Sequence, residues 1–444
     1  MRRLLSALLL LMLLGTLPAR AASDLNIIRD AETEEWLRTL ATPVWQQAGI
    51  PPENIHLVLV QNNQINAFVA GGMNIFIFTG LLKASKTPDE VLGVIAHETG
   101  HIAGGHLLRS EEEMRKASAT AILATIAGVA AAAASGDGSA GAAAIGLGQQ
   151  VAQQSYLSYS RTQESAADQA ALRFMDRAGL SAQGMHNFLQ RLQDQELLPS
   201  DQQSEFVRTH PLTRARVESV QAHIDSVTGK RNLPASAQAE FDRIMAKLNA
   251  YLDPRGTLSR IGPSATNFND RYARAIALHM TGDTMGAISL LDGLLREDPN
   301  NPYLNEFKGQ VLYESGRAAD AVAPYQKAVA LSNGNALLRV GLAQALLDTN
   351  GASNLPAAVN QLESALNSER DSPQLWRLLA TAYGRQNDMG MAAYALAAEA
   401  NVRGDRPTAV AQAKRAQQLL PTGSPGWLRA ADILANNEAS KDRK

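Results

Sequence analysis

The segment from Val94 to His101 holds two histidines and a glutamate at a spacing that suits metal chemistry. On a helix, His97 and His101 would share one face, because positions i and i+4 lie one turn apart, and both could bind the same metal ion. Imidazole nitrogens suit zinc, and a catalytic zinc keeps one position open for a water molecule. Glu98 stands beside the first histidine and could accept a proton from that water. This pattern predicts a metal-dependent hydrolase.

The residues before this segment predict the helix that it needs. Thr87 is a suitable N-cap, Pro88 is favoured at the first helical position, and Glu90 completes a capping box with Thr87. Leu92 and Ile95 follow at helical spacing and would provide an apolar face behind the histidines. We therefore expect a helix that begins at Pro88 and carries the whole motif.

A later segment offers a third ligand. A zinc ion held by two histidines needs a further protein ligand, and Glu164 lies near the start of a segment that is expected to be helical as far as Arg177. Asp168 is one turn further on, so it would share a face with Glu164 and could hydrogen-bond a ligand histidine. Taken alone, this E-x-x-x-D spacing is also typical of a solvated helix face.

Three motifs in a fixed order resemble a known peptidase family: H-E-T-G-H, then E-S-A-A-D, then H-P-L-T-R-A-R. Over roughly residues 30–225, the chain is similar to the gluzincin peptidases that include the HtpX-type and CAAX-prenyl-protease-type enzymes. The resemblance implies that His97, His101 and Glu164 bind one zinc ion per chain. It also implies that Glu98 is the general base of peptide hydrolysis.

A different zinc peptidase class, the metzincins, does not fit. That class needs a histidine six positions after His101, where Leu107 stands. His106 is one position short, and we expect it to be structural.

The histidine of the H-P motif has several possible roles. Pro211 favours an extended or turn conformation for His210, which by itself indicates an ordinary loop residue. Given the resemblance, the loop could bring His210 to the zinc as a fourth ligand that closes the site, or His210 could stabilise the tetrahedral intermediate. Arg216 could anchor this loop to an acidic group, for which Asp168 is a candidate.

Three short segments before the metal helix alternate as strands do, over residues 55–60, 65–69 and 74–78, with Asn- and Gly-rich turns between them. We expect a small antiparallel sheet in an α+β zincin-type domain that is otherwise mostly helical. The edge of such a sheet could bind an extended peptide by strand addition.

The composition is that of an ordinary globular protein, with 444 residues, a formal net charge of −2 and 19% charged residues. This balance provides no electrostatic basis for binding nucleic acid. Residues 1–21 combine two arginines, a leucine-rich run and an Ala-Arg-Ala site, which is the pattern of a secretory signal peptide; an uncleaved membrane anchor is the alternative. Since the chain has no cysteine, it has neither disulfides nor a residue for an N-terminal lipid, and we expect a soluble periplasmic protein.

Residues 117–148 consist mostly of Ala, Gly, Ile, Leu and Val. They could form a transmembrane hairpin, but alanine contributes little to membrane insertion, and the second half is short and rich in glycine. We expect instead a mobile apolar hairpin or lid beside the active site, which could make peripheral contact with a membrane or an apolar substrate.

The last part of the chain is repetitive. Gly282 and Gly316 recur at the interval of about 34 residues that is typical of tetratricopeptide repeats, and Gly351 follows at a similar interval. Each is followed by small residues and a helical pattern, which predicts an all-α domain of about four or five stacked units. A generic helical bundle is the alternative.

These features predict a signal peptide (1–21), a zinc metallopeptidase domain (22–250), a linker (251–268) and a tetratricopeptide-repeat domain (269–440). Peptidases of this family with such repeats resemble periplasmic proteases that act in the assembly and quality control of outer-membrane β-barrel proteins. The resemblance implies that the repeats bind these proteins and their assembly machinery. The alternative is a chaperone or scaffold without proteolytic activity, whose zinc site is structural or latent; the intact Glu98 argues against it.

Overall fold

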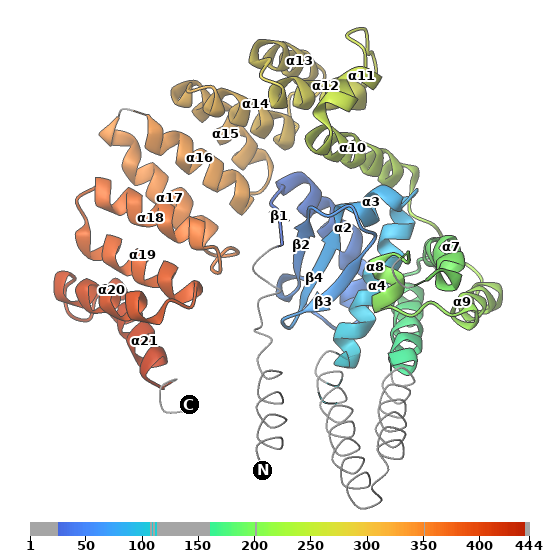
Figure 1. Ribbon diagram of the computed structural model, residues 1–444. Coiled ribbons are helices and arrows are strands. Elements are labelled where there is room, and N and C mark those ends of the chain that lie inside the picture. The colour runs from blue at the N-terminus through green and yellow to red at the C-terminus, as the bar shows by residue number, and fades with distance from the viewer. Residues whose placement is uncertain are drawn as a thin grey trace, which may run out of the picture. The chain divides into compact units, whose positions relative to one another are not determined.

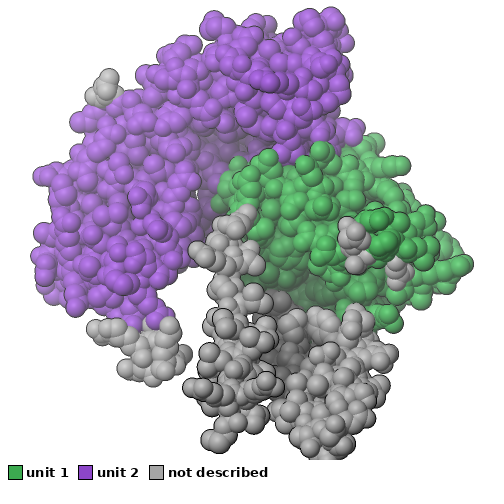
Figure 2. Space-filling model, viewed as in Figure 1, with its two compact units in different colours: residues 1–29, 33–241 green, residues 30–32, 242–444 purple. Residues whose placement is uncertain are grey.

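The computed structural model describes residues 25–106, 109, 112, 160–199, 202–349 and 351–439. These residues are mostly helical and include one small sheet (Figure 1). The chain divides into two compact units, with residues 1–29 and 33–241 in the first and residues 30–32 and 242–444 in the second (Figure 2). The expected signal peptide and the apolar segment over 117–148 lie outside the described residues.

The sheet is mixed and not antiparallel as expected. Its strands are β1 (Ile27–Ile28), β2 (His56–Val60), β3 (Ala67–Ala70) and β4 (Asn74–Phe78), in the order β1-β2-β4-β3. β1 pairs antiparallel with β2, and β3 pairs antiparallel with β4, but β2 and β4 are parallel. The prediction of an antiparallel sheet is therefore wrong for its central pair.

A short connection explains the parallel pair. Residues 61–66 leave β2, cross the end of β4 and enter β3 on the far side, so that β3 forms the hairpin with β4. The backbone N–H of Gly80 donates a hydrogen bond to the carbonyl oxygen of Asn62 at 2.8 Å. A Cβ on Gly80 would lie 2.2 Å from the carbonyl oxygen of Gln64, so only glycine lets the connection lie this close. The alternation of apolar residues identifies strands but carries no information about such a crossing.

The motif helix, α4 (Pro88–Gly104), begins where the sequence predicts. The Thr87 side chain accepts a hydrogen bond from the backbone N–H of Glu90 at 3.4 Å, and the Glu90 carboxylate accepts one from the N–H of Lys86 at 2.7 Å. The helix ends at Gly105, whose φ of 61° is the left-handed conformation that glycine adopts at low cost. These caps define a helix that holds the complete H-E-x-x-H motif.

Glycines on α4 let two other helices approach it closely. A Cβ on Gly100 would lie 2.5 Å from the carbonyl oxygen of Ala167, which belongs to a helix over residues 160–177. A Cβ on Gly93 would lie 2.6 Å from the Cα of Met185 in α7 (Gln183–Leu192). The absence of a side chain at Gly100 therefore determines how near the segment with Glu164 and Asp168 comes to the motif helix.

The other described helices of this part of the chain are α2 (Ala31–Gln47), η2 (Pro52–Asn54), α3 (Thr79–Ala84), η3 (Gln193–Leu197), α8 (Glu205–Thr209) and α9 (Arg214–Ser226). The short helix α8 is held beside the sheet, because the backbone N–H of Phe206 donates to the carbonyl oxygen of Ile65 at 2.9 Å. This bond places the loop that begins at His210 next to the first residue of β3.

The second unit consists of successive helix pairs that pack on one another (Figure 1). It begins within α10 (Ala235–Leu252) and continues with α11 (Pro254–Arg260). The pairs are α12 (Phe268–Met280) with α13 (Thr284–Glu297), α14 (Pro302–Glu314) with α15 (Ala318–Leu331), α16 (Ala336–Asp348) with α17 (Leu355–Ala365), α18 (Pro373–Arg385) with α19 (Met389–Val402), and α20 (Arg406–Leu419) with α21 (Pro425–Ala439). A 3-10 turn, η4 (Ala352–Asn354), precedes α17.

The residues that predicted the repeats occupy the positions that stacking requires. Ala287, Ala321 and Ala358 are each completely buried, because a small side chain lets neighbouring helices pack closely. Gly282 and Gly316 have φ angles of 94° and 76°, which let the chain turn tightly from one helix of a pair into the next. The expected tetratricopeptide-like repeats are confirmed.

The division between the two units falls between Phe241 and Asp242, inside α10. Part of the segment expected to be a linker forms the helix α11, in which Thr257 is buried. The domain boundaries given above stay predictions. In the part of the chain that the structure describes, no helix is both long enough and apolar enough to cross a membrane.

Candidate metal centre

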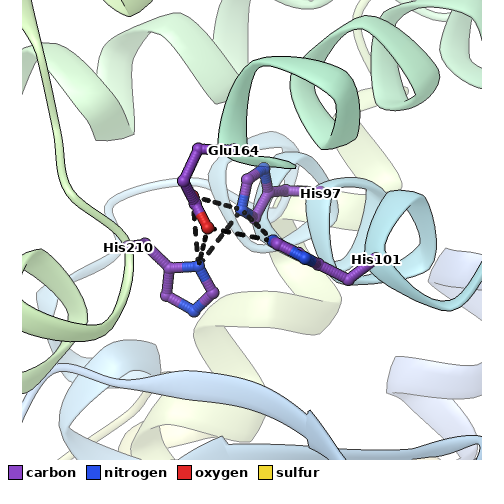
Figure 3. Close-up of side chains that lie close together, drawn as sticks. All are labelled: His97, His101, Glu164 and His210. Atoms are coloured by element: carbon purple, nitrogen blue, oxygen red, sulfur yellow. Dashed lines mark hydrogen bonds and ion pairs between the residues drawn. The ribbon is translucent and has the colours of Figure 1, made fainter. Parts of the chain in front are cut away.

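Four side chains from three segments converge beside α4 (Figure 3). His97 and His101 lie one turn apart on α4, Glu164 comes from the helix over 160–177, and His210 is the residue at which α8 ends. The potential ligand atoms of these four residues all lie within 4.8 Å of one another. The structure therefore brings together the three residues proposed as ligands and the histidine of the H-P motif.

The separations of the donor atoms suit a small metal ion. His97 Nε2 lies 3.0 Å from His101 Nε2 and 3.2 Å from Glu164 Oε2. Glu164 Oε1 lies 3.3 Å from His101 Nε2, and His210 Nδ1 lies 3.3 Å from both His97 Nε2 and Glu164 Oε2. In a tetrahedral site with ligand distances of about 2.0–2.1 Å, donor atoms are about 3.3 Å apart. Three imidazole nitrogens and one carboxylate at these separations fit zinc.

Asp168 and Arg216 support this cluster from behind. Asp168 Oδ1 lies 2.8 Å from His97 Nδ1 and accepts its hydrogen, so the Nε2 of the same ring faces the cluster. Arg216 donates to both oxygens of Asp168, from Nε at 2.6 Å and from Nη2 at 2.9 Å. Its Nη1 lies 3.0 Å from Glu164 Oε2 and donates to the carbonyl oxygen of Pro211 at 2.9 Å. One buried arginine thus orients two carboxylates and the loop after His210.

In His97, Glu164 and Asp168, burial shifts the pKa in one direction, and neighbouring charges and hydrogen bonds shift it in the other. Burial lowers the pKa of His97, but hydrogen bonds to Asp168 and Glu164 outweigh it and raise that pKa to about 10, so a metal ion that binds Nε2 has to displace a proton. Burial would raise the pKa of Glu164, but the charge of His210 and hydrogen bonds from three imidazoles hold it well below its usual range. Burial would also raise the pKa of Asp168, but the charge of Arg216 holds it below its usual range. Both carboxylates are therefore ionised at neutral pH, as binding of a divalent cation requires.

Glu98 lies beside the cluster. It is completely buried, and neither of its carboxylate oxygens has a hydrogen-bond partner among the described residues. Its Oε1 lies 3.5 Å from His210 Nε2. Burial raises the pKa of Glu98, which makes this carboxylate a stronger base than an exposed one. A buried carboxylate without hydrogen bonds is rare in native proteins and requires an explanation.

His210 presents one ring nitrogen to the cluster and the other to the sheet. Its Nε2 donates a hydrogen bond to the carbonyl oxygen of Ala67 at 3.1 Å, which leaves Nδ1 to face Glu164 and His97. The Phe206 ring packs against the imidazole, with ring centroids 4.8 Å apart. His210 therefore occupies the place that a fourth ligand would take.

Sequence reasoning did not anticipate two contacts of this site. It did not place the carbonyl of Ala67 at His210, because that contact joins residues far apart in the chain. It expected His106 to be structural but did not place it against His101; the Nδ1 atoms of the two rings are 3.0 Å apart. The sequence signal for this contact was the Gly104-Gly105 pair, which ends the helix just before His106.

The chain is similar to known proteins over both units. Residues 31–224 match the model of Peptidase family M48, and residues 312–382 match a Tetratricopeptide repeat model. The Beta-barrel assembly-enhancing protease of Yersinia pestis is 27% identical over 370 residues, which are 81% of this chain and 74% of the relative. The protein of the same name from Escherichia coli (strain K12) is 24% identical over 375 residues, 82% of this chain and 74% of the relative.

A mitochondrial metalloendopeptidase of Schizosaccharomyces pombe is 26% identical over 184 residues, which are 41% of this chain and 51% of that enzyme. The M48 match concerns the part of the chain that carries the cluster, whereas the repeat match concerns the stacked helix pairs. Residues 31–224 are therefore similar to M48 peptidases, and the stacked helix pairs that follow are tetratricopeptide-like repeats.

Proposed function

We propose that this protein is a periplasmic zinc endopeptidase that acts on outer-membrane β-barrel proteins and assists their assembly. The observation that carries the catalytic part is the convergence of His97, His101 and Glu164 beside a buried Glu98 that has no hydrogen-bond partner among the described residues. The names of the relatives, which cover both units of the chain, support the choice of substrate. A periplasmic location is supported by the signal-peptide pattern over residues 1–21.

The residues of the site divide the reaction between them. His97, His101 and Glu164 would hold the zinc ion, which supplies a Lewis acid for the scissile carbonyl and lowers the pKa of a bound water to about 7. Glu98 accepts the proton of the attacking water and passes it to the leaving amine. Asp168 keeps His97 in the tautomer whose Nε2 can bind the metal, and Arg216 keeps Asp168 ionised.

The strand β3 is suited to hold the substrate. It is an edge strand of the described sheet, and an extended peptide can pair with such an edge. The N–H of Phe78 donates to the carbonyl oxygen of Asn66 at 3.0 Å, so by the alternation of antiparallel pairs Ala67 and Val69 turn their backbone groups to the open edge. That edge adjoins the cluster, because the carbonyl of Ala67 contacts His210.

His210 would then block the site in two ways at once. Its Nδ1 takes the place that a catalytic water needs, and its Nε2 occupies the carbonyl of Ala67 that a substrate strand would use. A substrate that pairs with β3 competes for that carbonyl and thereby releases the ring from the cluster. This coupling supports the role of His210 as a displaceable fourth ligand over its role as an ordinary loop residue.

Replacing His210 by Ala is expected to raise basal peptide hydrolysis severalfold, together with self-cleavage, while hydrolysis still depends on Glu98. The physical reason is that the substitution frees both the fourth ligand position and the edge of β3. Initial rates on an unstructured fluorogenic peptide measure the effect. His223 on α9 is half-buried and pairs with Asp176, and it offers no atom to the cluster; as the control, His223→Ala should leave the rate unchanged.

Two other outcomes for His210→Ala would contradict the proposal that His210 blocks the metal site. A lower rate with the zinc content retained would show that His210 stabilises the tetrahedral intermediate. An unchanged rate would leave His210 as a loop residue.

The repeats offer a surface for protein partners. A cavity of about 690 Å³ lies among α13, α14 and α15. Two of its cations are paired, Lys308 with Asp292 at 2.6 Å and Arg317 with Asp320 at 2.7 Å. Lys327 also lines this cavity, is exposed and has no ion pair among the described residues. This residue can therefore bind an acidic group of a partner from the outer-membrane assembly machinery.

Replacing Lys327 by Glu is expected to reduce capture of that machinery severalfold in crosslinking co-purification from envelope membranes. Cleavage of a short unstructured peptide should not change, because the substitution lies on the repeats. The control is Lys414→Glu, which reverses the charge of another exposed lysine, on α20. Equal capture by both variants and the wild type would show that this cavity is not the docking surface.

A chaperone or scaffold without proteolytic activity is the second candidate. The observation that favours it is the fourth donor, since four protein ligands are typical of structural zinc sites. A purely structural site, however, has no use for a buried carboxylate at Glu98. Activity measurements on the Glu98 variant separate the two candidates.

A further inference from the structure

His106 lies against a ligand histidine without joining the cluster. Its ring is almost entirely buried, and its Nδ1 lies 3.0 Å from the Nδ1 of His101. The two imidazoles meet edge to face, with centroids 5.0 Å apart and planes at 83°. His101 turns its other nitrogen, Nε2, toward His97 and Glu164. The contact with His106 is thus on the side of the His101 ring that faces away from the ligand site.

The direction of this hydrogen bond follows from the role of His101. An imidazole that offers Nε2 to a metal carries its hydrogen on Nδ1, and that hydrogen then points at the Nδ1 of His106. His106 must accept it, so its own hydrogen is on Nε2. We propose that His106 is a positioning residue that accepts this hydrogen bond and aims the Nε2 of His101 at the metal. The inference rests on the zinc site of the proposed function.

The backbone at the end of α4 is shaped to bring this ring back onto the helix. Gly105 has a φ of 61°, and its N–H donates to the carbonyl oxygens of His101 and Ile102, so the backbone turns sharply at this residue. A Cβ on Gly104 would lie 2.3 Å from the Nε2 of His106. Any side chain at Gly104 would therefore push the His106 ring off His101.

The two ligand histidines of α4 are thus held by different acceptors. His97 donates to the carboxylate of Asp168, which Arg216 keeps ionised. His101 donates to an imidazole nitrogen instead. In both cases the acceptor fixes the tautomer and the rotation of the ligand ring, which is what an outer-sphere partner contributes to metal affinity.

The test uses the full chain with substitutions at His106 and two readouts, zinc affinity by chelator competition and the visible spectrum of the Co²⁺-loaded protein. His106→Asn keeps an acceptor near the place of Nδ1 and should bind zinc within a few-fold of the wild type. His106→Phe keeps the ring without an acceptor and should bind about 10–100-fold more weakly, with an altered Co²⁺ spectrum. Gly104→Ala should resemble His106→Phe, because it displaces the ring.

The control is His186→Phe, which replaces another buried histidine, on α7, that offers no atom to the cluster. It should leave zinc affinity unchanged. If His106→Phe and His106→Asn bind zinc equally, whether like the wild type or more weakly, the hydrogen bond is not the cause and the proposal is overturned. If instead the wild type itself does not bind zinc, the proposed function fails, and the two failures are thus distinguishable.

Discussion

Replacing Glu98 by Gln is expected to leave zinc bound and to lower peptide hydrolysis by about three to four orders of magnitude, the upper range for a positioned base. The amide has the volume of the carboxylate, so the fully buried site keeps its packing. It cannot, however, accept the proton of the attacking water. Burial raises the pKa of Glu98, so this carboxylate becomes protonated at a higher pH than an exposed one. As the pH is lowered, the rate of the wild type should therefore begin to fall at a higher pH than it would with an exposed base.

Glu164→Gln provides the contrast, since it alters a proposed ligand and not the base. Glu164 contacts both ligand histidines, and its loss should release zinc under mild chelation that leaves Glu98→Gln loaded. Zinc content and casein cleavage, measured side by side on the two variants, distinguish a lost base from a lost ligand. Equal cleavage by wild type and Glu98→Gln would disprove the enzyme assignment, and unchanged zinc retention would remove Glu164 from the ligands.

The local part of this site could be predicted because it depends on one helix. The spacing of His97 and His101 and the cap at Thr87 are properties of consecutive residues, and the structure reproduces both. The sequence also predicts the helix that carries Glu164. How closely this helix approaches α4, however, depends on Gly100, because any side chain there would contact the backbone of that helix. The periodic spacing of apolar residues predicts single helices and strands, but not the contacts between segments that are far apart in the chain.

The sheet and His210 show the same limit. Three strands were recognisable from their alternation, yet the order β1-β2-β4-β3 depends on a six-residue crossing that passes over Gly80. His210 could be assigned as a ligand only through family resemblance, since Pro211 by itself predicts a loop. The backbone hydrogen bond from Phe206 to Ile65 places that loop beside the cluster. Neither segment by itself contains a pattern that predicts this bond.

Replacing Arg216 by Met is expected to reduce the free energy of unfolding by about 3–5 kcal/mol, the usual effect of removing one partner of a buried ion pair. The guanidinium is buried and neutralises Asp168 and Glu164, which would remain as buried charges without it. Denaturant unfolding of the metal-free protein measures the loss. Zinc affinity should also fall about 10–100-fold, because Asp168 would no longer be held against His97.

Arg214→Met on the same helix is the matched control. Arg214 pairs with Glu218 at 2.7 Å, but both side chains are mostly exposed, so its removal should change stability by about 0.5 kcal/mol or less. Similar losses in the two variants would show that Arg216 acts through its apolar stem or through α9 in general, and not through the buried carboxylates.

The effect of Arg216→Met should also depend on pH in a defined direction. In the wild type, Asp168 and Glu164 have pKa values below those of an unfolded chain, so they contribute stability that is present above about pH 4 and is lost as the pH falls through their folded-state pKa values. In the variant the pKa of Asp168 rises, because the guanidinium that holds it low is gone, and protonation then relieves the buried charge. The stability difference between the two proteins should therefore be largest at neutral pH, and it should shrink as the pH falls through the raised pKa of Asp168 in the variant towards its lowered pKa in the wild type. A difference that stays constant down to pH 3 would mean that the guanidinium is not what keeps Asp168 ionised.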